Sequence, residues 1–387
     1  MLGRMSGPSG PGSLTRLLVL TPDFPPARGG IQVLLHRLLT GLEGFDIRIV
    51  TLAGEGAGEF DAGSALSTRR VQVPARAGQL RNVALDAVAL REAIAFRPAL
   101  TLSAHIVTSP AAALIRRVFG ARTVQYFYAK EIGNKPRLAA FAAHHADACI
   151  SISAYTSQLL REHGARPSLL RQIAPGVDLP ADAGALPAER PTVVTVSRLA
   201  DRYKGHDVLV RALALVRRQV PDVEWVVVGD GPLRGEIESQ VRAAGIQDTV
   251  RFVGAVSDQE RDDWLRRADL LAMPSRLPEG RLAGEGFGIV YLEAGAFGKP
   301  VVAGNVAGAL DAVEDGETGL LVDPTDAAAV AEAIATLLLD RSRAARMGAA
   351  GAERARRFAW PVMAERVGEL LAEQLAAADA GSRRGAT

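Results

Sequence analysis

The sequence predicts an α/β protein of two domains, each with a parallel β-sheet covered by helices on both faces. Short runs of aliphatic and β-branched residues alternate with helical patterns along the whole chain. The chain has 387 residues, 48% of them hydrophobic, which is enough for two cores of roughly 150–200 residues each. A Pro- and Ala-rich stretch at 175–191 separates the halves. We therefore expect two doubly wound domains facing each other across a cleft, with ligands at the carboxyl ends of the strands.

The candidate strands are distributed evenly between the two halves. The first half has runs at 16–20, 46–52, 99–103, 122–127, 147–153 and 170–174, and the second at 191–197, 223–229, 249–254, 269–275, 300–304 and 319–322. Near-continuous apolar runs are typical of strands buried on both faces. We place the domains at 16–185 and 186–358, after a Gly/Pro/Ser-rich lead-in at 1–15 that we expect to be disordered. A final helix at 359–380 follows, with apolar residues in helical period after Trp360.

Composition and charge exclude several classes of protein. The net charge of +2 gives no reason to expect a nucleic-acid partner, and the single cysteine, Cys149, excludes a disulfide framework or a cysteine-rich metal site. The apolar run Leu17–Leu20 is too short for a signal peptide, and no stretch approaches the roughly 20 apolar residues of a membrane span. We expect a cytoplasmic protein, with contact at the inner face of the membrane left open.

Two glycines follow the first predicted strand. Gly29 and Gly30, in TPDFPPARGG, precede a helix with Ile31, Leu34 and Leu35 on one face. A helix N-terminus offers free N–H groups to an anion, and glycine allows the ligand to approach the backbone closely. A tight turn that needs a positive φ explains the same pattern, so both interpretations stay open.

Two cations follow the first strand of the second half. Arg198 leaves this strand in VSRLADRYKGHD, and Lys204 directly precedes a helix. A cation at a helix N-terminus is unfavourable unless an anion joins it, and a bidentate Arg with a mobile Lys suits a diphosphate. Two solvated surface charges are the alternative. Gly229, in VVVGDGPLR, follows the next strand, but the segment is not GxGxxG and supports a nicotinamide site only weakly.

Two glutamates lie in EGFGIVYLEAGAFGKP at 285–300. Glu285 is at the expected helix start, where the helix dipole alone would favour a carboxylate. Glu293 has apolar residues at all of its three- and four-residue neighbours, which predicts a buried carboxylate. Its partner is either the hydroxyl groups of a ligand or an arginine. We expect Glu293 at the cleft, without an arginine partner until a nucleotide binds.

These motifs together resemble the retaining GT-B glycosyltransferases of family 4, over roughly residues 16–371. The markers are PPARGGIQ, APGVD, SRL…KG, VGDGPLR, MPS, EGFGIVYLEA and DGETGLLV, which are weak singly and highly specific in this order. DFPPARGGIQ and EGFGIVYLEA look closest to the actinobacterial mannosyltransferases of phosphatidylinositol-mannoside synthesis. Bacterial aminoglycoside glycosyltransferases, which use UDP-sugars, share much of the pattern. No Asp-x-Asp follows a strand, so we expect metal-independent chemistry without a cofactor.

The resemblance implies a role for each matching residue. Arg198 and Lys204 hold the donor diphosphate, Glu285 lies against the donor sugar, and Glu293 accepts the ribose hydroxyls. Gly30 faces the distal phosphate or the acceptor, and the backbone near Val256 contacts the base. The expected donor side as a whole is Gly29, Gly30, Arg198, Lys204, Gly229, Val256, Glu285, Gly286, Phe287, Gly288, Ile289, Val290 and Glu293.

One departure from the family pattern concerns the loop after the strand at 122–127. The family commonly has His-Gly-x-Glu there, and the histidine meets the donor sugar; here the residues are Tyr128, Ala129, Lys130 and Glu131. A tyrosine can still donate a hydrogen bond, but it does not titrate like imidazole. We therefore count Tyr128 with Arg198, Lys204 and Glu285 as catalytic candidates. The expected acceptor side is Gly30, His105, Tyr128, Lys130 and Glu131, with a packed His105 as the alternative.

The leading functional hypothesis is transfer of a hexose from a nucleotide diphosphate sugar to a hydroxyl of a lipid or a small molecule. Mannose from GDP-mannose is the first choice of donor. An aminoglycoside or secondary-metabolite transferase using a UDP-sugar, a nucleotide-sugar epimerase or hydrolase, and a non-catalytic binder of nucleotide sugars remain as alternatives. Tyr128 argues mildly against the epimerase and mildly favours the binder.

Overall fold

The structure is a computed structural model that describes residues 14–27, 29–74, 76, 78, 80–278 and 284–384. The strands before residue 173 are β1 (Thr15–Leu20), β2 (Phe45–Leu52), β3 (Ser67–Val71), β4 (Leu100–Ser103), β5 (Arg122–Phe127), β6 (Ala148–Ser151) and β7 (Leu170–Gln172). The strands after residue 191 are β8 (Thr192–Val196), β9 (Glu224–Val228), β10 (Val250–Gly254), β11 (Leu270–Met273), β12 (Val301–Gly304) and β13 (Gly319–Val322).

The helices of the first half include two short 3₁₀ turns, η1 and η2. They are α1 (Gly30–Thr40), α2 (Ala57–Ala62), α3 (Leu80–Phe96), η1 (Ile106–Thr108), α4 (Ser109–Phe119), α5 (Ala129–Asn134), α6 (Pro136–His145), α7 (Ala154–Glu162) and η2 (Pro167–Leu169). The second half has η3 (Arg202–Lys204), α8 (His206–Val216), α9 (Arg234–Ala243), α10 (Asp258–Arg267), α11 (Ile289–Ala296), α12 (Ala309–Ala312), α13 (Ala327–Leu339), α14 (Arg341–Arg357) and α15 (Trp360–Arg384).

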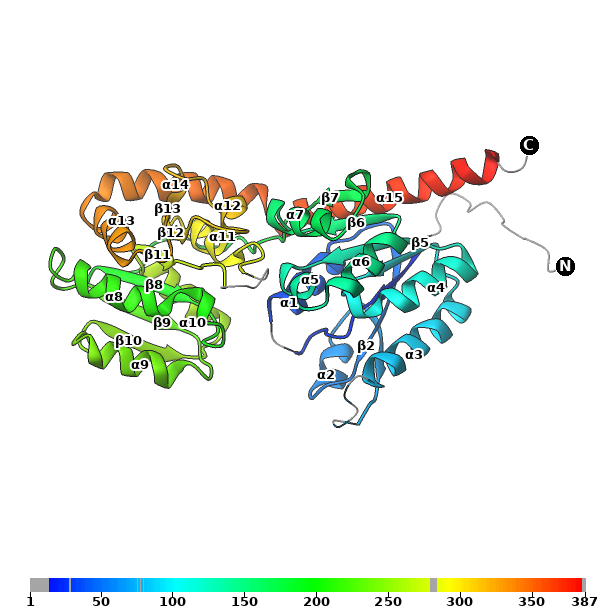
Figure 1. The fold of residues 1–387 in the computed structure, drawn as a ribbon, viewed down its shortest axis with the longest axis horizontal. Helices are drawn as coiled ribbons and strands as arrows, with labels where there is room; N and C mark the ends of the chain where they lie inside the picture. The colour runs from blue at the N-terminus through cyan, green and yellow to red at the C-terminus, as the bar shows by residue number, and fades with distance from the viewer. Residues whose placement is uncertain are drawn as a thin grey trace.

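The strands form two parallel sheets in two domains, as the sequence predicts. The first sheet has the order β3-β2-β1-β4-β5-β6-β7 and the second has the order β10-β9-β8-β11-β12-β13. Both are doubly wound, because the strand order reverses beside the first strand of each sheet. Figure 1 shows the two domains side by side along the longest axis of the molecule, with helices on both faces of each sheet. The linker at 173–191 contains the boundary that we placed between residues 185 and 186.

All twelve predicted runs contain a strand of the structure, and one strand was missed. The missed strand, β3, has the sequence STRRV and forms the edge of the first sheet, where only Val71 is buried. An edge strand with polar side chains lacks the apolar run by which the buried strands are found. The predicted lead-in at 1–15 lies mostly outside the described residues, since the description starts at residue 14 and β1 starts at Thr15.

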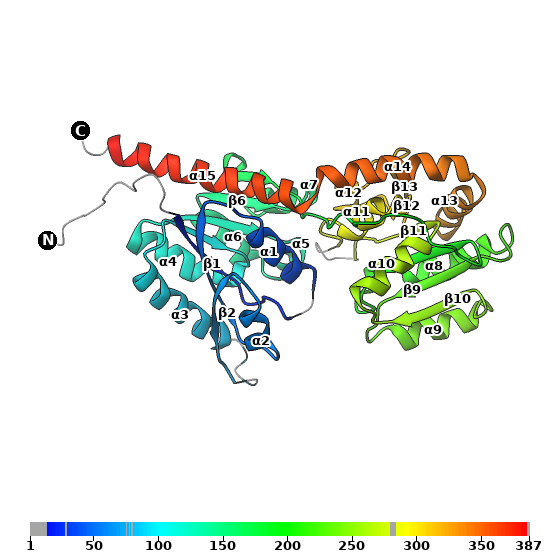
Figure 2. The ribbon, with the colours of Figure 1, turned by 180° about the vertical axis from the view of Figure 1, so that it is seen from behind.

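The final helix crosses from the second domain to the first, which confirms the expectation. α15 follows α14 and packs on α1 and β5 of the first domain, and Figures 1 and 2 show it running along that domain. Met363 and Val367 of α15 belong to the same buried apolar cluster as Leu35 of α1. The helix extends to Arg384, beyond the predicted end at residue 380.

The two chain crossings between the domains lie against each other. The N–H of Val177 donates to the carbonyl of Phe358 at 2.8 Å, and the N–H of Trp360 donates to the carbonyl of Val177 at 3.3 Å. The first crossing and the start of α15 therefore form one paired connection at the base of the cleft. Among the described residues, no helix is long and apolar enough to span a membrane.

Candidate active site

A cavity of about 320 Å³ lies between the two domains, where the strands of both sheets end. The second domain contributes the segments after β8 and β11, which are neighbouring strands on either side of the point where the strand order reverses. Doubly wound sheets bind their ligands at such points, and the volume is within the usual range for a ligand site. The lining includes these predicted residues: Gly30, Tyr128, Lys130, Arg198, Lys204, Glu285, Gly286, Phe287, Gly288, Ile289 and Val290.

Lys204 and Glu285 form an ion pair at this cavity. Lys204 Nζ lies 2.5 Å from Glu285 Oε2, and the two side chains are only 17% and 11% exposed. Burial alone would lower the pKa of Lys204, but the adjacent Glu285 carboxylate, with Tyr203 and Asp201, raises it above its usual value. Lys204 is therefore a charged ammonium at neutral pH, ready to meet a second anion.

The backbone turn after Lys204 requires a glycine. Gly205 has a φ of 81°, in the left-handed region, and a side chain on it would meet the carbonyl oxygen of Pro274 at 2.2 Å. The Lys-Gly dipeptide therefore places the lysine at the N-terminus of α8 while its turn packs on the segment after β11. Tyr203 and Asp201 precede this turn and also line the cavity. Both were missed from the sequence, although they lie between Arg198 and Lys204, which were identified.

Arg198 is exposed at the cavity and makes no ion pair or hydrogen bond with any described residue. It lies two residues after the end of β8, so the carboxyl end of this strand places Arg198 at the cleft. Arg198 and Lys204 thus place two cations in one cavity, one unpartnered among the described residues and one paired with Glu285. Lys204 is therefore not a solvated surface charge, whereas the exposed Arg198 is compatible with both interpretations.

The environment predicted for Glu293 is wrong in two respects. Its side chain is 28% exposed, and its Oε1 lies 4.0 Å from Nη1 of Arg261. The apolar neighbours Ile289 and Val290 are partly exposed because they line the cavity, so apolar spacing did not indicate a closed core. The partial burial of Glu293 still raises the pKa of its carboxyl group, and Arg261 opposes this effect.

The helix that carries Glu293 also begins later than predicted. α11 starts at Ile289, after Gly288 with a φ of 90°, so Glu285 is not within its first turn. A side chain on Gly288 would meet the ring of Tyr291 at 2.4 Å, which explains why a glycine is needed there. Glu285 is held by Lys204 rather than by the helix dipole.

Gly29 and Gly30 precede and begin helix α1, and no left-handed turn is needed at either. Gly29 has an extended backbone with a φ of 163°, and Gly30 has no positive φ. A side chain on Gly30 would meet no heavy atom within 4 Å, and Gly30 lines the cavity. The open space beside Gly30 therefore fits close approach of a ligand better than a tight turn.

Tyr128 lines this cavity from the first domain. Tyr128 is 5% exposed, and its hydroxyl has no hydrogen-bond partner among the described residues. Its ring stacks on Tyr126 with 5.3 Å between ring centroids. Burial, with the nearby Tyr126 and Glu131, raises its pKa well above 10. Tyr128 is therefore a neutral hydrogen-bonding group over the whole physiological range of pH.

Lys130 and Glu131 have different places in the structure. Lys130 Nζ lies 3.2 Å from Asp201 Oδ1, an ion pair that crosses the cleft between the domains. Glu131 is buried and accepts the N–H groups of Tyr128 and Ile106. Burial raises the pKa of Glu131 to about 8.

A second, smaller cavity of about 180 Å³ lies on the first domain and is lined by His105 and Glu131, with Arg81, Asn82 and Lys135. His105 Nδ1 lies 3.2 Å from Glu131 Oε2 and accepts the N–H of Val107. Burial, with Lys135 and Arg81, lowers the pKa of His105 to about 4. His105 is thus held by its neighbours and also lines a cavity, so both earlier interpretations describe part of its environment.

Gly29, Gly229, Val256 and Glu293 are not among the residues that line the interdomain cavity. Gly229 packs against the strand end instead, because a side chain on it would meet the carbonyl oxygen of Ser197 at 1.9 Å. Among the described residues, no three His, Cys, Asp or Glu side chains gather in a geometry that could hold a metal ion.

Models of known protein families match both domains. The family model for glycosyltransferase family 4 matches residues 28–180, and the model for glycosyl transferases group 1 matches residues 181–354. A crystal structure of Anabaena HepE in complex with UDP superposes with a TM-score of 0.77 at 22% identity, over 93% of this chain and 100% of that one. That likeness supports the GT-B fold.

Two curated relatives indicate the family more closely. A GDP-mannose-dependent alpha-(1-6)-phosphatidylinositol monomannoside mannosyltransferase of Mycobacterium tuberculosis is 34% identical over 381 residues, 92% of this chain and 98% of that protein. A D-inositol 3-phosphate glycosyltransferase of an Arthrobacter species is 38% identical over 200 residues, 48% of this chain and 46% of that protein. The protein is therefore a glycosyltransferase and belongs to family 4 of these enzymes.

Proposed function

We propose that the protein transfers mannose from GDP-mannose to a hydroxyl of an acceptor that carries an inositol phosphate, with retention of configuration at the sugar. The observation that carries the proposal is the convergence of Arg198, Lys204 and Glu285 in the cavity between the domains. The choice of donor rests on the relative from Mycobacterium tuberculosis, which matches 92% of this chain and whose name states dependence on GDP-mannose.

In the proposed reaction, the bond between the anomeric carbon and the diphosphate oxygen breaks as the acceptor oxygen bonds to the same carbon. Negative charge grows on the leaving diphosphate, and Arg198 and Lys204 stabilise it. The leaving phosphate takes the proton of the acceptor hydroxyl, so the reaction balances without another reactant. Glu285 orients Lys204 and lies where the sugar would bind, and the Tyr128 hydroxyl offers that sugar a hydrogen bond from the opposite domain.

The proposed acceptor site is the smaller cavity of the first domain. Arg81 and Lys135 line it, are exposed, and form no ion pair with any described residue. The Oδ1 atom of Asn82 in the same cavity is buried without a hydrogen-bond partner. Two free cations beside an unsatisfied amide suit a phosphate with neighbouring hydroxyls. Both curated relatives have an inositol phosphate in the name of their substrate.

The source of that inositol phosphate is either a lipid or a free cyclitol phosphate, and we propose the lipid. Leu80 and Val83 on α3 are exposed beside Arg81, so one turn of this helix presents apolar and basic groups together. Such a surface suits contact with anionic lipid at the inner face of a membrane. Arg69 and Arg70 of β3 add no free charge to this surface, because they pair with Glu92 and Asp61.

One experiment tests both the donor and the acceptor. The protein is incubated with a panel of GDP- and UDP-sugars, with vesicles containing phosphatidylinositol monomannoside or with free inositol phosphates, and release of nucleotide diphosphate is followed. Release with GDP-mannose only in the presence of the vesicles supports the proposal. Release with free inositol phosphate would move the acceptor to the soluble class, and release with a UDP-sugar would overturn the choice of donor. Binding without turnover would favour the non-catalytic alternative.

The acceptor cavity has its own test. Arg81→Gln and Lys135→Gln should raise KM for the acceptor and leave KM for GDP-mannose unchanged. Arg137→Gln is the control, because Arg137 is exposed at the start of α6 and does not line the cavity. Equal acceptor KM values in all three variants would contradict this assignment.

A further inference from the structure

The Lys204–Glu285 pair joins two segments that are far apart in the chain. Lys204 lies in η3, after β8, whereas Glu285 lies on the segment that leaves β11. These segments leave adjacent strands, and the ion pair requires that they lie against each other. Arg276 lies on the segment after β11, before Glu285, and contacts the Lys204 turn on both sides.

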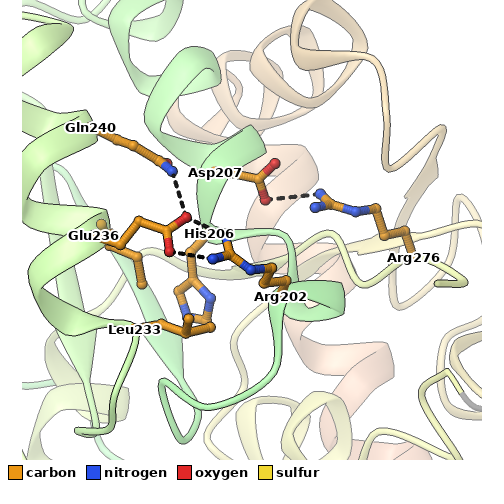
Figure 3. Close-up of a pocket in the computed structure, with 8 residues that line it drawn as sticks. Arg202, His206, Asp207, Leu233, Glu236, Gln240 and Arg276 are labelled. Carbon is orange, nitrogen blue, oxygen red and sulfur yellow. Dashed lines mark hydrogen bonds and ion pairs between the residues drawn. The ribbon is translucent and has the colours of Figure 1, made fainter. Parts of the chain in front are cut away.

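The contacts of Arg276 enclose the turn. Its backbone N–H donates to the carbonyl of Tyr203 at 2.8 Å, immediately before Lys204. Its Nη1 lies 2.8 Å from Oδ1 of Asp207, in the first turn of α8 after Gly205. Figure 3 shows the Arg276 side chain reaching Asp207 from the neighbouring segment. The turn between Tyr203 and Asp207 is thus fixed at both ends by one residue of the Glu285 segment.

Arg202 and Arg276 line one small pocket of the second domain, and Arg202 provides a comparison for the role of Arg276. Arg202 makes a bidentate ion pair with Glu236 of α9, and Gln240 also donates to this carboxylate (Figure 3). The Arg202 side chain is 66% exposed, compared with 24% for Arg276. The Arg202 side chain forms no hydrogen bond or ion pair with Tyr203 or Asp207, and its interaction with the Asp207 carboxylate is a weaker electrostatic one. Arg202 does not line the interdomain cavity. Its pair ties η3 to α9 and leaves the Glu285 segment untouched.

We propose that Arg276 is a positioning residue, which holds the Lys204 turn against the Glu285 segment so that the ion pair is formed before the donor binds. The importance of the pair for transfer rests on the proposed function, but the positioning itself is a property of the free protein. Preformed charges in an active site need no rearrangement at the moment of reaction, which is where their effect on rate arises.

The test uses the reactivity of lysines in the free protein. The chain has only four lysines, Lys130, Lys135, Lys204 and Lys299, so acetylation by acetic anhydride can be followed at each by mass spectrometry. Acetylation requires the neutral amine, and the pairing with Glu285 keeps Lys204 charged against the effect of its burial. Exposed Lys135 is the internal reference.

Arg276→Gln should raise the acetylation rate of Lys204 relative to Lys135 by about tenfold, the change expected when one charged hydrogen bond is lost. Asp207→Asn removes the same bond from the other end and should give a similar increase. Arg276→Lys should restore slow acetylation in part, because it keeps a cation beside Asp207. Arg202→Gln is the matched control and should behave like the wild type.

Unchanged Lys204 reactivity in both Arg276→Gln and Asp207→Asn would overturn the proposal. An equal increase in Arg202→Gln would do the same, because it would mean that any loosening of η3 has this effect. The proposed function is tested separately, by protection of Lys204 when GDP is added to the wild-type protein. If GDP does not protect Lys204 from acetylation, the donor assignment is contradicted. The acetylation rates of the variants without GDP would still decide the role of Arg276.

Discussion

Lys204 Nζ and Glu285 Oε2 lie 2.5 Å apart and bring one cation and one anion of the predicted site into direct contact. The sequence motifs indicate Lys204 at the diphosphate and Glu285 at the sugar, and they do not indicate that the two residues bind each other. The pair explains how a mostly buried lysine remains charged in the absence of a nucleotide. It also means that the two residues act as a unit.

Substitution of either member of this pair should impair both catalysis and stability. Lys204→Met and Glu285→Gln should each lower kcat/KM for the donor by about 100- to 1,000-fold, as the loss of a charge-stabilising group does elsewhere. Each should also lower the free energy of unfolding by about 1–3 kcal/mol, because a mostly buried charged group loses its partner. Urea unfolding and nucleotide release measure the two effects.

The double variant decides whether the residues are coupled. Lys204→Met/Glu285→Gln should lose less stability than the sum of the two single variants, because no unpaired charge remains. Strict additivity would mean that the ion pair does not stabilise the free protein. Lys130→Met serves as the control, since its ion pair with Asp201 is much more exposed and should contribute less than about 1 kcal/mol.

A second prediction concerns Glu293, which lies one helical turn beyond the cavity-lining Ile289 and Val290. If Glu293 accepts the ribose hydroxyls of the donor, Glu293→Gln should weaken GDP binding by about tenfold, the effect of losing a hydrogen bond to a charged group. The same variant and the wild type should bind 2′,3′-dideoxy-GDP equally well. Calorimetry with both ligands measures this difference. A loss of affinity of the same size for the dideoxy nucleotide would assign Glu293 to the structure of α11 rather than to ribose.

The fold was predictable because buried parallel strands are apolar on both faces. Most of the strands follow this rule. The edge strand β3 does not, because Thr68, Arg69 and Arg70 face solvent or an ion pair. The opposite edge strand, β7, is also largely exposed, and it was found only because its predicted run continues into the apolar residues that follow it. The crossover helix was predictable for a similar reason, since its apolar residues recur in helical period over its whole packed face.

The sequence allowed many of the residues that line the candidate site to be named, but it did not predict which of them contact each other. Gly-rich turns and charged residues at strand ends identified Lys204, Arg198 and Glu285, because the topology brings strand ends together. The ion pairs of Lys204 and Arg276 depend on distances that local patterns do not contain. Glu293 was misjudged because apolar neighbours on a helix are equally compatible with a closed core and with the wall of a cavity.

A third prediction uses pH and the carboxyl group of Asp86, one helical turn along α3 from Asn82 of the smaller cavity. Burial raises the pKa of Asp86 on α3 to about 7, and its Oδ1 has no hydrogen-bond partner among the described residues. The folded state therefore holds this proton more tightly than the unfolded state does. The resulting stability is fully present below about pH 4, is lost as the pH rises through 7, and does not change further above that range.

Asp86→Asn removes this titration. The free energy of unfolding of the variant, relative to the wild type, should increase between pH 4 and pH 7 and then level off. Urea unfolding at several pH values measures it, with Asp46→Asn, at an exposed position, as the control for the substitution itself. A constant difference for Asp86→Asn would mean that this carboxyl group is not desolvated in the folded protein.

The last prediction concerns the Tyr128 hydroxyl, which is buried at the cavity without a hydrogen-bond partner among the described residues. A buried hydroxyl without a partner costs about 1–3 kcal/mol, so Tyr128→Phe should leave the free protein as stable as the wild type or make it more stable. If the hydroxyl binds the donor sugar, the same variant should lower kcat/KM for the donor by about tenfold. A gain or no change in stability together with a loss of activity distinguishes a ligand-binding hydroxyl from a structural one.

Tyr126→Phe is the control, because Tyr126 stacks on Tyr128 but does not line the cavity. The kcat/KM of this variant for the donor should equal that of the wild type. Equal donor kcat/KM values in the wild type and Tyr128→Phe would remove Tyr128 from the catalytic site.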